Sequence, residues 1–343
     1  MNNTLTALKG VKVGHSTHAD KLTGCTFISF DKDYPIAYKS YGGAPGTYAT
    51  ENLNNGKSFS TRDGLFIAGG SLNGLTAATT IVQRLIDKKL GFKSGKSIMP
   101  AISGAIVFDL GFEVAQFDPE YGKEAVDNLS SEPVKGGNVG AGTGTTVGSF
   151  SYTKKLERLD MKAGVGSARI DLGHGIIVCA LSVVNALGNV TLPNGTILAG
   201  NRHDEDDPKF RNFDTQMEFL TGKSSNTTIS IVGTNAKLSS HTDYERIAHI
   251  ASHGQVRAIY PVHSSVDGDT VFVFSTEEVD DYLTLLGKSI QKHGWPELNV
   301  DVIAQAAAKA VQQSIYDACE QAESIEFKGG YKGIIPCSKD YPL

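Results

Sequence analysis

The chain has 343 residues, 40% of them hydrophobic and 20% charged, which is the composition of a globular protein with a sizeable core. Its 32 basic and 37 acidic residues give a net charge of −5, and the lack of a basic run argues against nucleic-acid binding. Four widely spaced cysteines without a CxxC pair indicate neither a zinc ribbon nor a disulfide framework. The first residues lack the apolar core of a signal peptide and no apolar run is long enough to span a membrane, so we expect a cytoplasmic protein that does not bind membranes.

The first half of the chain combines apolar runs with a helical pattern. The runs LFIAG at 65–69 and AIVFDL at 105–110 are typical of buried strands. A helix is predicted over 75–90, because apolar residues recur at helical spacing at Ala78, Ile81, Val82, Leu85 and Ile86.

The second half continues in the same way. Further strands are predicted at the apolar runs 175–184, 229–232 and 270–275. Thr242 and Glu245 form a capping-box pattern that predicts the start of a helix, and Gly254 predicts its end.

A last helix, rich in Ala and Gln, is predicted over 301–322, and the residues from Ile325 onward look like a loosely packed tail. Strands and helices mixed in this way indicate an α/β or α+β fold. We therefore expect a single domain over 1–324, followed by a C-terminal tail over 325–343.

Two loops are rich in glycine. GGAPGT at 42–47 lacks the Gly-Lys-Ser/Thr ending of a phosphate-binding loop, and GNVGAGTGTTVG at 137–148 does not match the dinucleotide-binding pattern. Such loops suit a cleft that binds a substrate through backbone amides, and no cofactor is expected. The histidines, including the pairs His15/His18 and His249/His253, form no metal-binding pattern, so no metal site is predicted.

A polar, turn-rich segment covers 189–226 and leads into Asn226-Thr227-Thr228, directly before the strand predicted at 229–232. One interpretation of this step is a polar turn, and a second is an N-glycosylation acceptor, which a cytoplasmic location would remove. In a third interpretation, the hydroxyl that follows the peptide bond attacks that bond. A long loop is a place where a chain can be cut without losing its core.

Asp267-Gly268-Asp269 lies between two apolar runs. The simplest interpretation is an Asp-Gly hairpin turn. Alternatively, two carboxylates held at the start of a strand can orient a hydroxyl or an ammonium group. The segment has too few oxygen ligands at alternating positions for a calcium loop.

Seven motifs follow one another over most of residues 10–320: KVGHST, GGAPGT, IAGGSLNGLTAA, AIVFDLG, GNVGAGTGTTVG, NTTISIVGTNAKLS and IYPVHSSVDGDTVFVFSTEEVD. In this order they resemble the DmpA-like aminopeptidase family, whose relatives include β-peptidyl aminopeptidases and the nylon-oligomer (6-aminohexanoate-oligomer) hydrolase. The second half is most similar to the nylon-oligomer hydrolase.

The resemblance implies a four-layer αββα sandwich in a homo-oligomer, with a tetramer of cleaved protomers as the expected state. It also implies self-cleavage between Asn226 and Thr227 into fragments 1–226 and 227–343, after which Thr227 is the nucleophile. Its new α-amine, with an ordinary pKa of about 8, can take the hydroxyl proton. Strand periodicity places Thr228 on the opposite face but does not choose between the two threonines; the resemblance selects Thr227.

The resemblance also assigns roles to three further side chains. Asn185 matches an active-site Asn that stabilises an oxyanion. Asp267 and Asp269 match an acidic pair that orients the nucleophile.

Two positions depart from the nylon-oligomer hydrolase. Ser149 stands where that enzyme has a Lys, so a charged hydrogen bond near the nucleophile is missing unless Lys154 or Lys155 supplies it. Phe108 stands where that enzyme has a Tyr, which removes a phenolic hydroxyl from the expected substrate-binding cleft.

We therefore expect a hydrolase of amide bonds in short substrates with a free amine: peptides, β-peptides, amino-acid amides or 6-aminohexanoate oligomers. The alternatives are acyl transfer, as in the ornithine acetyltransferases, and a binding protein that has kept the fold without the chemistry. Transfer predicts that an amine outcompetes water for the acyl-enzyme, and the binding protein predicts a chain that stays uncut.

Overall fold

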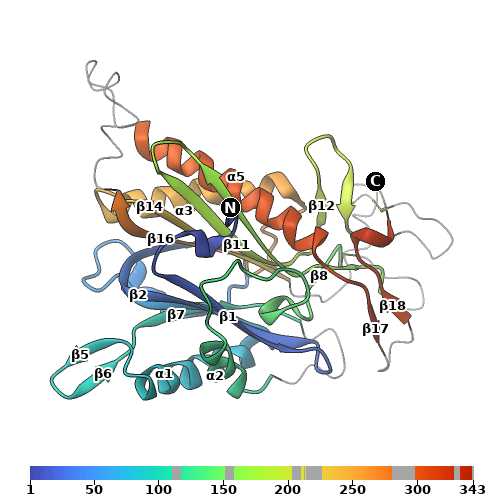
Figure 1. Cartoon of the computed structure of the whole chain (residues 1–343). Helices are drawn as coiled ribbons and strands as arrows, with labels where there is room; N and C mark the ends of the chain where they lie inside the picture. The colour runs from blue at the N-terminus through green and yellow to red at the C-terminus, as the bar shows by residue number, and fades with distance from the viewer. Residues whose placement is uncertain are drawn as a thin grey trace.

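The computed structural model describes residues 1–109, 117–150, 158–202, 210–211, 213, 226–279, 298–327 and 333–341. A nine-stranded sheet dominates it, in the order β10-β11-β14-β16-β2-β4-β7-β3 with β1 paired to β2 (Figure 1). Its strands are β1 Val11–His18, β2 Thr23–Ser40, β3 Thr47–Tyr48, β4 Thr61–Ala68, β7 Ile102–Ile106, β10 Val165–Asp171, β11 Ile177–Asn185, β14 Thr227–Ala236 and β16 Thr270–Val279.

The long strand β2 divides this sheet into two layers. Its first part pairs with β1 and β4, whereas its last residues, Ile36 to Ser40, pair with β16. The described helices cover the two outer faces and are α1 Ala77–Asp87, α2 Glu120–Asp127, α3 His241–Ala258 and α5 Leu298–Glu320.

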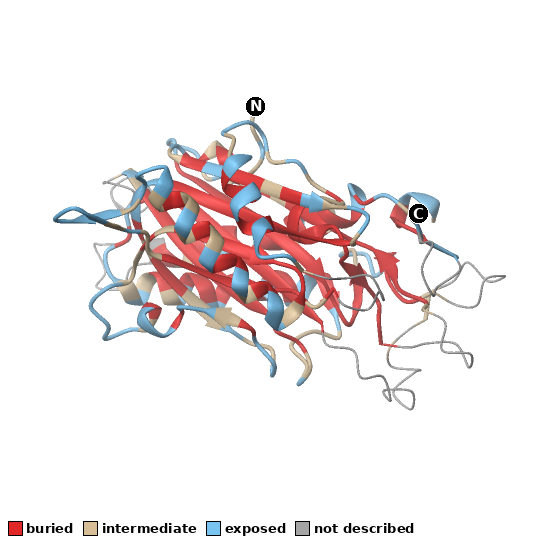
Figure 2. Cartoon of the chain, turned by 90° about the horizontal axis from the view of Figure 1, so that it is seen from below, coloured by how far each residue is buried: buried red, intermediate tan, exposed pale blue. Residues whose placement is uncertain are grey.

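Three apolar cores separate four layers. Residues such as Ile67, Leu181 and Phe272 pack between the two halves of the sheet. Helices α3 and α5 cover one outer face and α1 and α2 the other, each over its own core. Figure 2 shows the buried strands between helices whose outer sides are exposed. The predicted αββα sandwich is therefore confirmed.

Strand β14 lies in the middle of the second layer. It is antiparallel to β11 and parallel to β16, and all ten of its residues are buried. Both faces of the strand are covered, so its polar residues do not point to solvent. Ser230, for example, lies 2.9 Å from the Ser182 hydroxyl.

The predicted strands at 65–69, 175–184 and 270–275 and the helices at 75–90 and 301–322 match β4, β11, β16, α1 and α5 within a few residues. The strand predicted at 105–110 is wrong in its bounds. Strand β7 starts at Ile102 and ends at Ile106, and residues 107–109 have left the strand. Residue 110 lies outside the described residues.

The predicted cap of helix α3 is also wrong. Ser240 is the N-cap and forms the capping box with Asp243, so the helix begins at His241. Gly254 does not end the helix, which continues to Ala258. A Cβ at Gly254 would lie 2.3 Å from the Ala308 carbonyl oxygen of α5, so this glycine allows two helices to approach closely.

Four smaller sheets complete the described strands. They are the pairs β5 Phe92–Ser94 with β6 Ser97–Met99 and β8 Thr146–Val147 with β9 Met161–Lys162, the group β12 Asn189–Thr191, β13 Ile197–Ala199 and β15 Ile259–Tyr260, and the pair β17 Ile325–Phe327 with β18 Gly333–Ile335. No helix in the described ranges is long and apolar enough to cross a membrane.

The end of the chain is packed where the structure describes it. Cys337 is buried, the Pro336 carbonyl accepts a hydrogen bond of 2.8 Å from the Lys162 amide, and the Ser338 hydroxyl donates to the Cys319 carbonyl. The expectation of a loosely packed tail is wrong for these residues.

Candidate active site

Strand pairing brings four of the predicted site residues together in two pairs. Thr227 is the first residue of β14 and pairs directly with Asn185, the last residue of β11. Asn226 forms an isolated parallel bridge with Asp267. All four residues are buried, although they come from three distant parts of the sequence.

The carbonyl oxygen of the peptide bond between Asn226 and Thr227 accepts two hydrogen bonds. The Thr227 hydroxyl donates a hydrogen bond of 2.5 Å to the Asn226 carbonyl oxygen, which places it beside the carbonyl that it would attack. The Gly268 amide donates to the same oxygen at 2.8 Å. An amide in this position stabilises the negative charge that develops on the oxygen during attack.

Gly268 is a candidate functional residue that the sequence prediction missed. A Cβ at this position would lie 2.8 Å from the Thr227 hydroxyl oxygen, so a larger residue would press on this hydroxyl group. The only signal in the sequence was a glycine between two aspartates. The hairpin interpretation of Asp267-Gly268-Asp269 is wrong, because β15 pairs with β12 while β16 pairs with β14 and β2.

Asp269 fixes the backbone next to Thr227. Its Oδ1 accepts a hydrogen bond of 2.6 Å from the Thr228 amide. Its Oδ2 accepts from the His263 amide at 3.0 Å and lies 2.9 Å from the His263 Nδ1. The His263 ring in turn stacks on Tyr41, with 5.2 Å between ring centroids.

One carboxylate oxygen of Asp267 is bonded and the other can still accept a hydrogen bond. Its Oδ2 accepts a hydrogen bond of 2.7 Å from the Ser264 amide, whereas its buried Oδ1 has no partner among the described residues. Burial, and then the nearby charge of Asp269, raise the pKa of the Asp267 carboxyl. A carboxylate of this kind can accept a proton or bind an ammonium group.

Asn185 connects two loops to the site. Its Oδ1 accepts a hydrogen bond of 3.1 Å from the Thr146 amide, and its Nδ2 donates at 2.8 Å to the Phe108 carbonyl. Phe108 is half-buried just after β7. Because an Asn amide has two N–H groups, Nδ2 keeps one donor beyond the bond to Phe108.

Ser149 lies directly beside the Asn226 side chain. Its hydroxyl donates a hydrogen bond of 2.7 Å to the Asn226 Oδ1. The position that departs from the nylon-oligomer hydrolase thus still contacts the residue before the predicted cut. Lys154 and Lys155 lie outside the described residues.

Lys162 is a second functional candidate that the sequence prediction missed. Its side chain is fully buried, and its ammonium group donates to the carbonyls of Gly142, Thr145 and Ala163 at 3.0, 2.9 and 2.5 Å. Burial lowers the pKa of this amine to about 7. The lysine thus supports the Gly-rich loop whose Thr146 amide holds Asn185.

One histidine of each pair noted in the sequence lies within hydrogen-bond distance of a hydroxyl group. His15 lies 2.9 Å from the Thr26 hydroxyl and His249 lies 3.0 Å from the Tyr41 hydroxyl. Within the part of the chain that the structure describes, no three His, Cys, Asp or Glu side chains are grouped so that they could hold a metal ion.

Comparison with known proteins decides the family. Residues 3–332 match peptidase family S58. The chain belongs to this family. The S58 chain is 30% identical to an uncharacterized aminopeptidase of Mycobacterium leprae, over 97% of this chain and 94% of that protein. It is 26% identical to the 6-aminohexanoate-oligomer endohydrolase of Agromyces sp., over 90% of this chain and 84% of that protein.

Solved structures confirm the fold of this S58 chain. A Burkholderia sp. β-aminopeptidase superposes with a TM-score of 0.67 at 17% identity, covering 96% of this chain and 89% of its own. The L-aminopeptidase D-Ala-esterase/amidase of Ochrobactrum anthropi, described as a variant of the Ntn-hydrolase fold, gives 0.67 at 18% identity over 98% and 90%. The family and its relatives identify the chain as an amide-bond hydrolase.

Proposed function

We propose that the chain cleaves itself between Asn226 and Thr227 and that Thr227 then hydrolyses amide substrates. The observation that carries this proposal is the pair of hydrogen bonds that the Asn226 carbonyl oxygen accepts, from the Thr227 hydroxyl and the Gly268 amide. These two contacts support the proposal, because attack by the hydroxyl oxygen needs a donor to the same carbonyl oxygen.

The cleavage forms and breaks bonds in sequence. The Thr227 oxygen attacks the Asn226 carbonyl carbon, and the Gly268 amide stabilises the resulting oxyanion. The C–N bond then breaks as the Thr227 nitrogen takes up the proton that the hydroxyl loses, which leaves an ester between Asn226 and the Thr227 oxygen. Water hydrolyses this ester and releases the Asn226 carboxylate and a free Thr227 with an α-amine.

The same hydroxyl acts on substrates after cleavage. The Thr227 α-amine accepts the hydroxyl proton as the oxygen attacks a substrate amide, and water hydrolyses the acyl-enzyme. Asp269 holds the adjacent Thr228 amide, and Asn185 keeps an amide N–H for the substrate oxyanion. These two residues and Asp267 position the reacting groups.

The proposed substrates are short amides with a free amine: 6-aminohexanoate oligomers, peptides, β-peptides or amino-acid amides. The open Oδ1 of Asp267 supports this class, because a buried carboxylate oxygen binds an ammonium group well. Two relatives, an aminopeptidase and a 6-aminohexanoate-oligomer endohydrolase, support it as well. We further propose a cytoplasmic homo-oligomer, a tetramer of cleaved protomers, that acts on small molecules alone.

Intact-mass measurement of the purified protein tests the cleavage. We expect two fragments that correspond to residues 1–226 and 227–343, with Thr227 at the start of the smaller one by N-terminal sequencing. A full-length chain in a preparation that hydrolyses amides would overturn the self-cleavage proposal.

A further inference from the structure

The β5–β6 hairpin projects from the body of the protein beside α1 (Figure 1). The two strands pair only with each other, and all of their residues are exposed except the half-buried Ile98. A two-stranded hairpin without further packing is marginally stable in water. This hairpin would gain stability from a surface that covers it.

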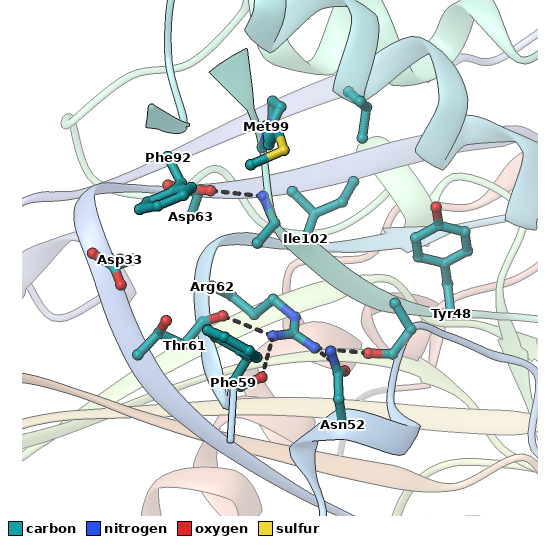
Figure 3. Close-up of a pocket in the computed structure, with 14 residues that line it drawn as sticks. Asp33, Tyr48, Asn52, Phe59, Thr61, Arg62, Asp63, Phe92, Met99 and Ile102 are labelled. Atoms are coloured by element: carbon teal, nitrogen blue, oxygen red, sulfur yellow. Dashed lines mark hydrogen bonds between the residues drawn. The ribbon is translucent and has the colours of Figure 1, made fainter. Parts of the chain in front are cut away.

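Large apolar side chains are exposed on and next to the hairpin. Phe59 is 78% exposed and Phe92 is 62% exposed, and the group as a whole, here called the hairpin patch, consists of Tyr48, Phe59, Leu90, Phe92 and Met99. Most of these residues line a cavity of about 610 Å³ (Figure 3). An exposed apolar patch of this kind marks a surface that binds a partner.

The floor of the cavity is preformed. Arg62 is buried, and its guanidinium donates to the Ser103 hydroxyl and to the carbonyls of Phe59, Thr61 and Ala49, as the dashed lines in Figure 3 partly show. It also donates to the Asn52 side chain. The arginine therefore holds the chain that carries Phe59 and is not free to bind a ligand.

Positive charges lie on the hairpin side of the patch, and negative charges lie on the cavity side. The hairpin and the turn before it carry the exposed lysines Lys89, Lys93 and Lys96, whereas Asp33 and Asp63 line the cavity. In a two-fold contact, each half of a patch faces the other half of the same patch in the second copy. The lysines of one copy would then lie near the aspartates of the other.

We propose that the hairpin patch is a self-association surface, in which the β5–β6 hairpin of one copy covers the cavity beside Phe59 of a second copy. This inference rests on the homo-oligomer proposed above and names the surface that forms it. The patch lies at the starts of β4 and β7, whereas Phe108, whose carbonyl bonds to Asn185, follows the end of β7. Association and catalysis can therefore be disturbed separately.

Sedimentation velocity of the whole cleaved protein tests the proposal, with Phe92→Asp as the variant. Val256→Asp is the matched control, because Val256 is 52% exposed on α3, outside the hairpin patch. We expect Phe92→Asp to weaken association by about 100-fold or more and to give a smaller species, as for the central residues of other interfaces. The control keeps the wild-type species, and circular dichroism checks that both variants fold.

A charge-reversal pair sharpens the test. Lys93→Glu weakens association, and Asp33→Lys in the same chain restores part of it. If the wild type is an oligomer and the Phe92→Asp variant is the same oligomer, the proposed surface is wrong, although the protein is still a homo-oligomer. A monomeric wild type that still hydrolyses amides would overturn both, and would leave the catalytic proposal standing.

Discussion

His263 and Asp269 form a pair directly behind the start of β14. The Asp269 Oδ2 lies 2.9 Å from the His263 Nδ1 and accepts the His263 amide, while its Oδ1 accepts the Thr228 amide. The carboxylate thus connects the ring of His263 to the backbone next to Thr227. His263 has φ of 60°, a backbone conformation that Asn tolerates better than most residues.

We predict that Asp269→Ala lowers kcat by about 100-fold or more, because the Thr228 amide loses its acceptor and the nucleophile its orientation. His263→Asn is expected to lower kcat by about 10-fold with little change in KM, since a positioning residue acts through Asp269. Steady-state kinetics on an amino-acid amide measures both. His253→Asn, an exposed residue on α3, is the control, and equal losses in the two histidine variants would contradict the assignment.

Thr227→Ala is expected to leave the chain uncut and inactive, because one hydroxyl serves both reactions. Thr228→Ala is the matched control: its buried hydroxyl has no partner among the described residues, so its loss leaves no polar group unpaired. Gels and intact mass report the cleavage. Thr227→Ser is expected to retain some cleavage and some activity. Normal cleavage in Thr227→Ala would show that the nucleophile lies elsewhere.

Gly268→Ala is predicted to slow self-cleavage by at least about 10-fold, as expected when an oxyanion donor and its surroundings are displaced. The added Cβ would lie 2.8 Å from the Thr227 hydroxyl oxygen and 3.2 Å from its methyl carbon. The time course of cleavage in freshly synthesised protein measures the rate. A variant that folds, by circular dichroism, and is cut as fast as the wild type would remove Gly268 from the site.

Asp267→Asn is predicted to raise KM for substrates with an ammonium group more than it lowers kcat. The pKa of the Asp267 carboxyl is raised, so kcat/KM of the wild type should fall with decreasing pH while ordinary carboxyls are still ionised. The variant should lose this part of the profile. Kinetics as a function of pH, with an N-acetylated substrate as control, checks both statements; an unchanged profile would contradict them.

The lowered pKa of Lys162 predicts that the free energy of unfolding depends on pH. Burial lowers the pKa of its amine from about 10.5 to about 7, so between these values the unfolded chain binds a proton that the folded chain does not. The free energy of unfolding should therefore rise with pH in this window, by at most about 1.4 kcal/mol per pH unit from this group. Urea unfolding of Thr227→Ala, with and without Lys162→Met, should show the slope only where Lys162 is present.

The apolar patterns predict most of the strands and helices, and the family resemblance predicts the four layers, better than either predicts the details around them. Apolar runs identify β4, β11 and β16 because buried strands need apolar residues on both faces. The helix cap was misplaced because two overlapping patterns, Ser240 with Asp243 and Thr242 with Glu245, satisfy the same local rule. In the structure the helix begins at His241, so Ser240 is the cap.

The roles of Gly268 and Lys162 could not be predicted in the same way. The Gly268 amide donates to the carbonyl of Asn226, and the Lys162 side chain donates to the carbonyls of Gly142 and Thr145. These contacts join backbone atoms of loops that are distant in the sequence, and backbone atoms leave no mark on residue type. A lysine in an apolar stretch indicates an exposed side chain more often than a buried one.

The position of β14 gives the proposed cut an unusual outcome. Strands β14 and β16 come after residue 226, yet they lie between β11 on one side and β2 on the other, both from before it. Cleavage after Asn226 would therefore yield two polypeptides that both contribute strands to the same sheet. Neither fragment could dissociate without breaking the hydrogen bonds between these strands. Each cleaved protomer would therefore behave as an obligate heterodimer whose two chains come from one gene product.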